Sequence, residues 1–162
     1  MIEEELEKVR ALRAAGREPE YLAAAIDLAR RAPASTEAQV EAAYACDRFG
    51  DERDAIRYYD AAWGLGVPDD ERPRFLVGYG STLRNVGRSD ESVAVLAQAA
   101  ADYPEDAALR AFLALSLLSA GHPREAVATL LGLLMEIAPP GALRGYERAL
   151  DFYYRELLDT TT

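Results

Sequence analysis

The chain has little of the chemistry on which most catalytic and metal sites depend. Its 162 residues contain one cysteine, Cys46, and one histidine, His122. A single cysteine excludes an internal disulfide and a thiolate-rich metal site. The sequence also lacks a Gly-x-x-x-x-Gly-Lys phosphate loop, a Gly-x-Gly-x-x-Gly dinucleotide motif and a His-Glu-x-x-His zinc motif. We therefore expect no catalytic residues, no metal and no cofactor, and we predict that the protein is not an enzyme.

Lysine is scarce as well, and acidic residues outnumber basic ones. Lys8 is the only lysine, and 18 basic against 28 acidic residues give a formal net charge of −10. Phosphate backbones and acidic lipid surfaces repel such a chain, so we expect no nucleic acid and no membrane among its partners. Arg110 and Glu136 interrupt the two longest apolar runs, and the start of the chain is acidic, unlike a secretion signal. These features predict a cytoplasmic location.

Residues that favour β-structure are few. Valine, isoleucine and threonine together number 18, whereas alanine numbers 31 and leucine 21. Alanine and leucine favour helices, and β-branched residues favour strands. The composition therefore predicts an all-α protein, and its length is that of one domain.

Four glycines, Gly16, Gly50, Gly87 and Gly121, mark an internal repeat. They are separated by 34, 37 and 34 residues, and each is followed by a polar residue and a new apolar helical pattern. Glycine accepts the left-handed conformation that ends a helix, and polar residues suit the first turn of the next one. Extra residues in the segment 64–70 account for the longer spacing. Each unit is therefore predicted to be two helices joined by a tight turn.

Residue size repeats with the same period. Small residues stand where paired helices must approach closely, and one larger residue in each unit is expected to fill the space between them. The small residues are Ala43, Gly80, Ala114, Ala55, Ser92 and Ala126, and the larger ones are Tyr59, Leu96 and Leu130. Pro33 and Pro104 occupy the same place in their units, where proline would end the second helix.

This pattern resembles the tetratricopeptide repeat, including small bacterial members of that family without an assigned function. The resemblance implies a right-handed α-solenoid of about four helix-turn-helix units and a C-terminal capping helix. The units are expected at residues 2–35, 36–72, 73–106 and 107–140, and the capping helix at 141–158, all within a single domain of residues 1–162. The last helix would cover the apolar face that the fourth unit leaves bare. Asp159 and residues 160–162 are expected to fray.

In that family the first helix of each unit lines the concave side of the solenoid, so the resemblance implies a binding groove there. The residues expected to contact a partner are Tyr44, Arg48, Arg74, Arg84, Asn85, Phe112, Leu115 and Leu118. The arginines and the asparagine would orient the partner, and the three apolar residues would bury its apolar side. The predicted function is a non-catalytic protein-interaction module or scaffold that binds a peptide or helix in this groove.

The charge of the second unit indicates which partner the groove would favour. Residues 36–72 contain ten acidic and four basic residues, so most of the net charge lies there. Opposite charges steer association. We therefore expect an amphipathic partner that carries some positive charge toward Glu37, Glu41 and Asp47.

Two other functions are also open. Helix 107–119 is apolar nearly all round and needs cover from helix 142–158, from a second copy or from a foreign peptide. The protein could therefore be a self-assembling homo-oligomer whose groove is filled by another copy. A small-ligand sensor or enzyme anchored by Tyr44, Arg48 and Arg84 is a further alternative. Cys46 and His122 are expected to be a packed thiol and an exposed turn residue, and the acidic clusters to cap helices rather than bind metal.

Overall fold

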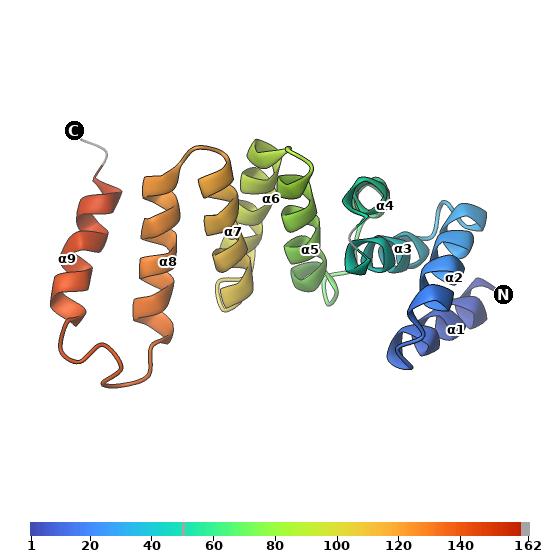
Figure 1. Cartoon of the computed structure of the whole chain (residues 1–162), viewed down its shortest axis with the longest axis horizontal. Coiled ribbons are helices and arrows are strands. Elements are labelled where there is room, and N and C mark those ends of the chain that lie inside the picture. Colours follow the sequence, from blue (N-terminus) through green and yellow to red (C-terminus); the bar gives the residue numbers. More distant parts are fainter. Residues whose placement is uncertain (50, 160–162) are drawn as a thin grey trace.

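Nine helices follow one another in the part of the chain that the structure describes. The structure is a computed structural model that describes residues 1–49 and 51–159, and these contain no strand. The helices are α1 (Ile2–Ala14), α2 (Glu18–Arg31), α3 (Thr36–Arg48), α4 (Glu52–Leu65), α5 (Arg72–Asn85), α6 (Ser89–Asp102), α7 (Ala107–Ser119), α8 (Pro123–Ile137) and α9 (Glu147–Leu158). Helix pairs succeed one another along the long axis, with the termini at opposite ends (Figure 1). The predicted all-α solenoid of helical repeats is confirmed. None of these described helices is long and apolar enough to span a membrane.

Tight turns within the helix pairs close on glycines. Gly16, Gly87 and Gly121 have φ values of 66°, 86° and 86°, a conformation that residues with a side chain rarely adopt. In each turn, backbone amides return to carbonyls of the last helical turn. Gly50, the remaining turn glycine of the repeat, and residues 160–162 lie outside the described residues.

The core lies between paired helices, where small and large residues meet. Tyr59 and Leu96 have no exposed area. A Cβ added at Gly80 would lie 2.5 Å from the Leu96 side chain, so glycine is needed for α5 and α6 to approach this closely. Leu130, which the same register predicted to fill the fourth unit, is 44% exposed. The prediction is wrong at this position because none of the described helices follows as a first helix that covers the residue.

Aromatic rings join the second repeat to the third. The ring centroid of Tyr59 lies 5.2 Å from that of Phe75, 5.8 Å from that of Tyr79 and 6.2 Å from that of Tyr44. Ring pairs at these distances attract one another beyond their burial of apolar area. A Cβ added at Gly78 would lie 2.3 Å from the Tyr59 hydroxyl oxygen, so glycine makes room for this ring. The cluster sets the position of α5 against α3 and α4.

The final helix, α9, begins later than expected. It starts at Glu147, whereas the capping helix was expected from residue 141. Residues 138–146 form bends and turns instead, and Gly141, Arg144 and Gly145 all have positive φ there. The double proline and the two glycines within this segment do not support a continuous helix.

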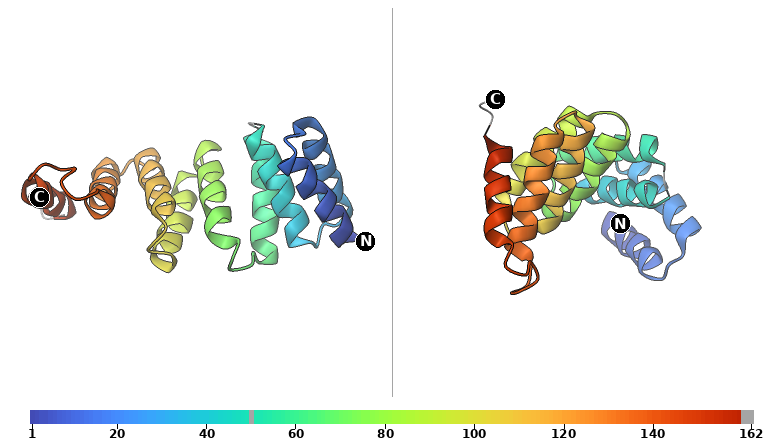
Figure 2. Two further views of the ribbon diagram at one scale, coloured as in Figure 1. Left: turned by 90° about the horizontal axis from the view of Figure 1, so that it is seen from below. Right: turned by 60° about the vertical axis from the view of Figure 1, so that its left-hand side comes forward.

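The position of α9 decides what it covers. Its Cα atoms come within 8 Å of α8 and of no other helix in the described chain. Figure 2 shows α9 beyond α8, on the side away from α7. Leu115 and Leu118 of α7 therefore remain 41% and 57% exposed. Within this structure the last helix does not supply the cover that helix 107–119 was expected to need.

Candidate protein-interaction surface

Two adjoining cavities lie over the first helices α1, α3 and α5. Their volumes are about 350 Å³ and about 340 Å³, and Arg13 lines both. We call them together the arginine groove. Its lining includes Arg10, Arg13, Glu41, Tyr44, Arg48, Glu71, Arg74 and Gly78. The structure thus brings together three of the residues expected from the sequence, Tyr44, Arg48 and Arg74.

Tyr44 and Arg74 form the centre of the arginine groove. The guanidinium carbon of Arg74 lies 4.8 Å from the centroid of the Tyr44 ring, a cation–π arrangement. The Tyr44 hydroxyl donates to a Glu71 carboxylate oxygen at 2.6 Å. Burial, and then the Glu71 carboxylate, raise the pKa of Tyr44 far above its usual value, so the hydroxyl stays a donor. Arg74 is exposed and forms no ion pair with any described residue, so its charge faces solvent.

Arg48 stands at the edge of the same groove. Its guanidinium lies 2.9 Å from a Glu18 carboxylate oxygen, and both side chains are about half exposed. An ion pair this exposed contributes little to stability, because water and salt screen it. Arg48 can therefore exchange Glu18 for an acidic group of a ligand at small cost.

Glu41 is buried, which changes the expected charge of the groove. Its carboxylate lies 3.2 Å from Arg10 and 3.1 Å from Arg13, and it accepts a hydrogen bond of 3.0 Å from the Tyr21 hydroxyl. Only 3% of Glu41 is exposed. Its charge is thus compensated inside the protein and is not offered to a partner. Of the three acidic residues that we expected to attract a basic partner, Glu37, Glu41 and Asp47, only Glu37 is exposed.

Asp47 is a partly buried carboxylate that also lines the groove. One of its oxygens accepts a hydrogen bond of 3.1 Å from the Tyr59 hydroxyl, and the other lies 3.5 Å from the Thr82 hydroxyl. Burial raises the pKa of Asp47, and these two hydrogen bonds oppose that shift only in part. The charged form of Asp47 is therefore a cost to the folded state.

Asp47→Asn is expected to raise the urea midpoint at neutral pH, because asparagine keeps an acceptor for Tyr59 and removes the charge that burial penalises. The folded-state pKa of Asp47 lies above its unfolded value, so the folded wild type gains stability as pH falls through that pKa. The advantage of the variant should therefore shrink toward about pH 4. Urea denaturation followed by circular dichroism at several pH values measures this. A variant less stable than wild type at neutral pH would contradict it.

Arg84 and Asn85 do not line the arginine groove. The Arg84 guanidinium donates to the Asn85 side-chain oxygen at 3.1 Å, and the Asn85 amide donates to Glu52 at 2.5 Å. Asn85 borders a separate cavity of about 350 Å³ with Glu52 and Arg53 at the start of α4. Asn85 thus links α5 to α4, and neither Arg84 nor Asn85 lines the cavities that contain Tyr44 and Arg74.

The three apolar residues of α7 differ in exposure. Phe112 is partly buried against the core formed by α3 to α7. Leu115 and Leu118 are exposed and lie outside both cavities of the arginine groove. Phe112 thus packs in part against the core, whereas Leu115 and Leu118 expose apolar surface at the C-terminal end of the array.

Sequence reasoning missed Arg10 and Arg13. They stand at the same places in the first unit as Tyr44 and Asp47 in the second, since each pair is offset by one 34-residue period. Applying the groove positions to the first unit would have found both. Their pairing with Glu41, from the next repeat, depends on how α1 lies against α3 and has no signal in the sequence.

The two side chains with the most reactive chemistry lie apart from the groove. Cys46 is buried, and burial followed by the nearby Asp54 carboxylate raises its pKa to about 11. Its thiol is therefore protonated at neutral pH and is a poor nucleophile. His122 is about half exposed and precedes α8, as expected from its turn position.

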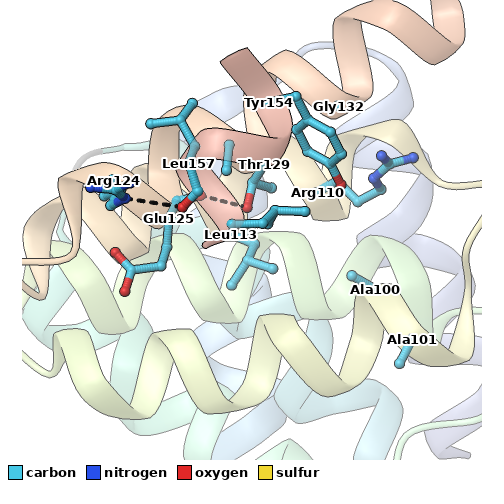
Figure 3. A pocket seen from close by; sticks show the side chains of 12 residues that line it. Ala100, Ala101, Arg110, Leu113, Arg124, Glu125, Thr129, Gly132, Tyr154 and Leu157 are labelled. Carbon is cyan, nitrogen blue, oxygen red and sulfur yellow. Dashed lines mark hydrogen bonds between the residues drawn. The ribbon is translucent and has the colours of Figure 1, made fainter. Parts of the chain in front are cut away.

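A further cavity, of about 400 Å³, lies among α6, α7, α8 and α9 (Figure 3). Arg110 is paired with Glu136 at 2.5 Å, and Arg124 donates to the Leu157 carbonyl of α9 at 3.1 Å. Both arginines that line the cavity therefore already bond to other groups of the chain. This cavity is a hollow between helices that the sequence did not predict.

Comparisons with known proteins agree with this architecture. The Pseudomonas aeruginosa pilF structure is 18% identical, with a TM-score of 0.64 over 98% of this chain and 73% of that one. The MamA RS-1 ArsTM double mutant is 14% identical, with a TM-score of 0.70 over 98% and 93%. TTC0263, a thermophilic TPR protein of Thermus thermophilus, is 22% identical, with a TM-score of 0.58 over 98% and 81%. At these identities the likeness shows the fold alone.

Sequence comparisons add the family. No curated protein sequence matches the chain. A family model described as tetratrico peptide repeat matches residues 36–157, which is most of the chain. The chain therefore belongs to the tetratricopeptide repeat family, whose helical arrays serve as scaffolds for protein–protein interaction.

Proposed function

We propose that this protein is a non-catalytic scaffold that holds a peptide or helix of a partner protein in the arginine groove. The observation that carries the proposal is Arg74, a solvent-facing guanidinium held over the Tyr44 ring without an acidic partner among the described residues. A charge fixed in this way loses little side-chain freedom when it binds a ligand. The family supports the class of function, because repeat arrays present extended surfaces to protein partners.

The charges around the groove favour an amphipathic partner with an acidic group near Tyr44. Arg74 faces solvent, and Arg48 is paired with the exposed Glu18. The exposed Glu37, at the other cavity, suits a basic residue of the same partner. The other residues expected from the sequence lie outside the two cavities of the groove: Arg84, Asn85, Phe112, Leu115 and Leu118.

The chemistry of the groove does not favour an enzyme. Neither the buried thiol of Cys46 nor the exposed ring of His122 lines it. The tyrosines in it are donors with raised pKa values, not nucleophiles. An unpaired cysteine also suits a reducing compartment, so we place the protein in the cytoplasm.

Arg74→Glu is expected to lower capture of specific partners about tenfold or more, because it replaces a charge-assisted contact with a repulsive one. Quantitative affinity purification from native lysate, with equal amounts of each bait, measures the effect. Arg57→Glu on α4 is the matched control, since Arg57 is 77% exposed and outside the groove. The proposal fails if Arg74→Glu and wild type capture the same proteins in equal amounts while both are fully helical.

A further inference from the structure

The fourth repeat leaves open the surface on which a fifth would stack. Tyr59 and Leu96 occupy the same place in the second and third units as Leu130 in the fourth. Tyr59 is covered by Phe75 and Tyr79 of the following first helix, α5, and both Tyr59 and Leu96 have no exposed area. Leu130 has no such cover and is 44% exposed.

The first helix of the fourth repeat, α7, also exposes side chains on the side where a fifth repeat would stack. Leu118 occupies the place of Asp47, whose side chain contacts Thr82 of the next first helix. Leu115 occupies the place of Tyr44, which bonds to Glu71 at the start of that helix. We call the exposed aliphatic side chains of α7 and α8 the terminal face, and each of them is between 41% and 58% exposed. They are Leu115, Leu118, Val127, Leu130, Leu134 and Ile137.

The chain's own last helix does not fill the terminal face. α9 lies against another side of α8, where a Cβ added at Gly132 would be 3.1 Å from the Tyr154 ring (Figure 3). Leu130 and Leu134 are two residues from Gly132, and so lie about 200° away around the helix axis. Arg124 donates to the carbonyls of Glu156 and Leu157 and holds α9 in this position.

The distribution of charge indicates which surface would cover the terminal face. The terminal face has no charged residue, and residues 107–159 contain five basic and six acidic residues, so this end of the chain is nearly neutral. The opposite end of the array, α1, exposes Glu3, Glu4, Glu7 and Lys8. Stacking α1 of one copy on the terminal face of another would desolvate these charges against aliphatic groups. Packing of the terminal face against the same face of a second copy would desolvate none of these charges.

We propose that the terminal faces of two copies pack against each other, α7 and α8 of each, as a dimer with two-fold symmetry. Six half-exposed aliphatic side chains would bury on the order of 500 Å² per copy, and their flanks extend the patch toward the roughly 600–1,000 Å² per partner of a stable interface. An apolar patch of this size is comparable to the largest patch found on a monomer surface, and such patches often mark an interaction site. The arginine groove, on α1, α3 and α5, remains free in this dimer.

Analytical ultracentrifugation between about 1 and about 100 μM tests the proposal. Wild type should reach twice the mass of the chain at the upper end. Leu134→Glu should raise the dimer dissociation constant at least about 100-fold, because each interface would bury two carboxylates. Leu65→Glu is the matched control: Leu65 is 44% exposed against 47% for Leu134, and it lies on α4, so this variant should dimerise like wild type.

Two results would overturn the dimer. One is a monomeric wild type at about 100 μM; the other is a dimer that Leu134→Glu leaves intact. Circular dichroism checks that the variant is folded, and Val127→Glu, at a residue 53% exposed, gives a second substitution in the same face. A monomeric wild type would contradict the dimer but not partner binding in the arginine groove. Unchanged partner capture by Arg74→Glu would contradict that binding but not the dimer, so the two proposals are tested separately.

Discussion

Tyr59→Ala will lower the free energy of unfolding by about 3–5 kcal/mol, the range for removing a large aromatic side chain from a core. Tyr59 has no exposed area and packs against Tyr44, Phe75 and Tyr79 from two neighbouring helices. Its loss leaves a cavity at the junction of the second and third repeats. Urea denaturation followed by circular dichroism measures the change in free energy.

Tyr59→Phe separates the ring from its hydroxyl. It keeps the packing and removes the donor to Asp47, and is expected to cost about 1–2 kcal/mol. Because stacked repeats interact mainly with their neighbours, Tyr59→Ala should also separate unfolding of the N-terminal repeats from that of the C-terminal ones. A loss below about 1.5 kcal/mol for the alanine variant would show that the ring is not the main link at this junction.

Glu41→Ala is expected to lower the free energy of unfolding by about 2–4 kcal/mol, because it removes one side of a buried charge cluster. The Tyr21 hydroxyl, in a residue only 1% exposed, would lose its carboxylate acceptor. Arg13 would lose both of its hydrogen bonds to Glu41 and remain partly buried beside α3. The first repeat should therefore detach from the second more easily, which hydrogen exchange of α1 and α2 would detect together with urea denaturation.

Two substitutions on α3 serve as controls for Glu41. Glu41→Gln keeps the shape and an acceptor for Tyr21, and should cost less than the alanine variant. Glu37→Ala removes an exposed carboxylate from the same helix, and should change the free energy of unfolding by no more than about 0.5 kcal/mol. Equal losses from Glu41→Ala and Glu37→Ala would show that the buried cluster does not stabilise the fold.

Much of the fold could be predicted because packing between adjacent helices imposes a local pattern on residue size. The spacing of Gly16, Gly87 and Gly121 marked turns that the structure has, and the register of Tyr59 and Leu96 marked the core. The same register failed at Leu130. Its burial depends on a following helix, and the register of a single unit cannot show whether that helix is in place.

The candidate site was predictable only in part. Tyr44, Arg48 and Arg74 lie together because first helices of consecutive repeats share one side of the array. The repeat register predicted Asn85 in the same site. Its amide instead donates to Glu52 of the preceding helix, which holds the side chain at a separate cavity. Which neighbour a polar side chain bonds to depends on the distance and rotation between helices, and neither is encoded in its position along its own helix.

The sequence by itself determined the helical class, the repeat and the family, since these follow from composition and from a period that local packing requires. Only the tertiary structure decided that Glu41 is neutralised by Arg10 and Arg13, and that α9 leaves the terminal face open. Both outcomes depend on contacts between units, where the angle at which one helix meets the next sets which charges pair and which apolar side chains stay exposed.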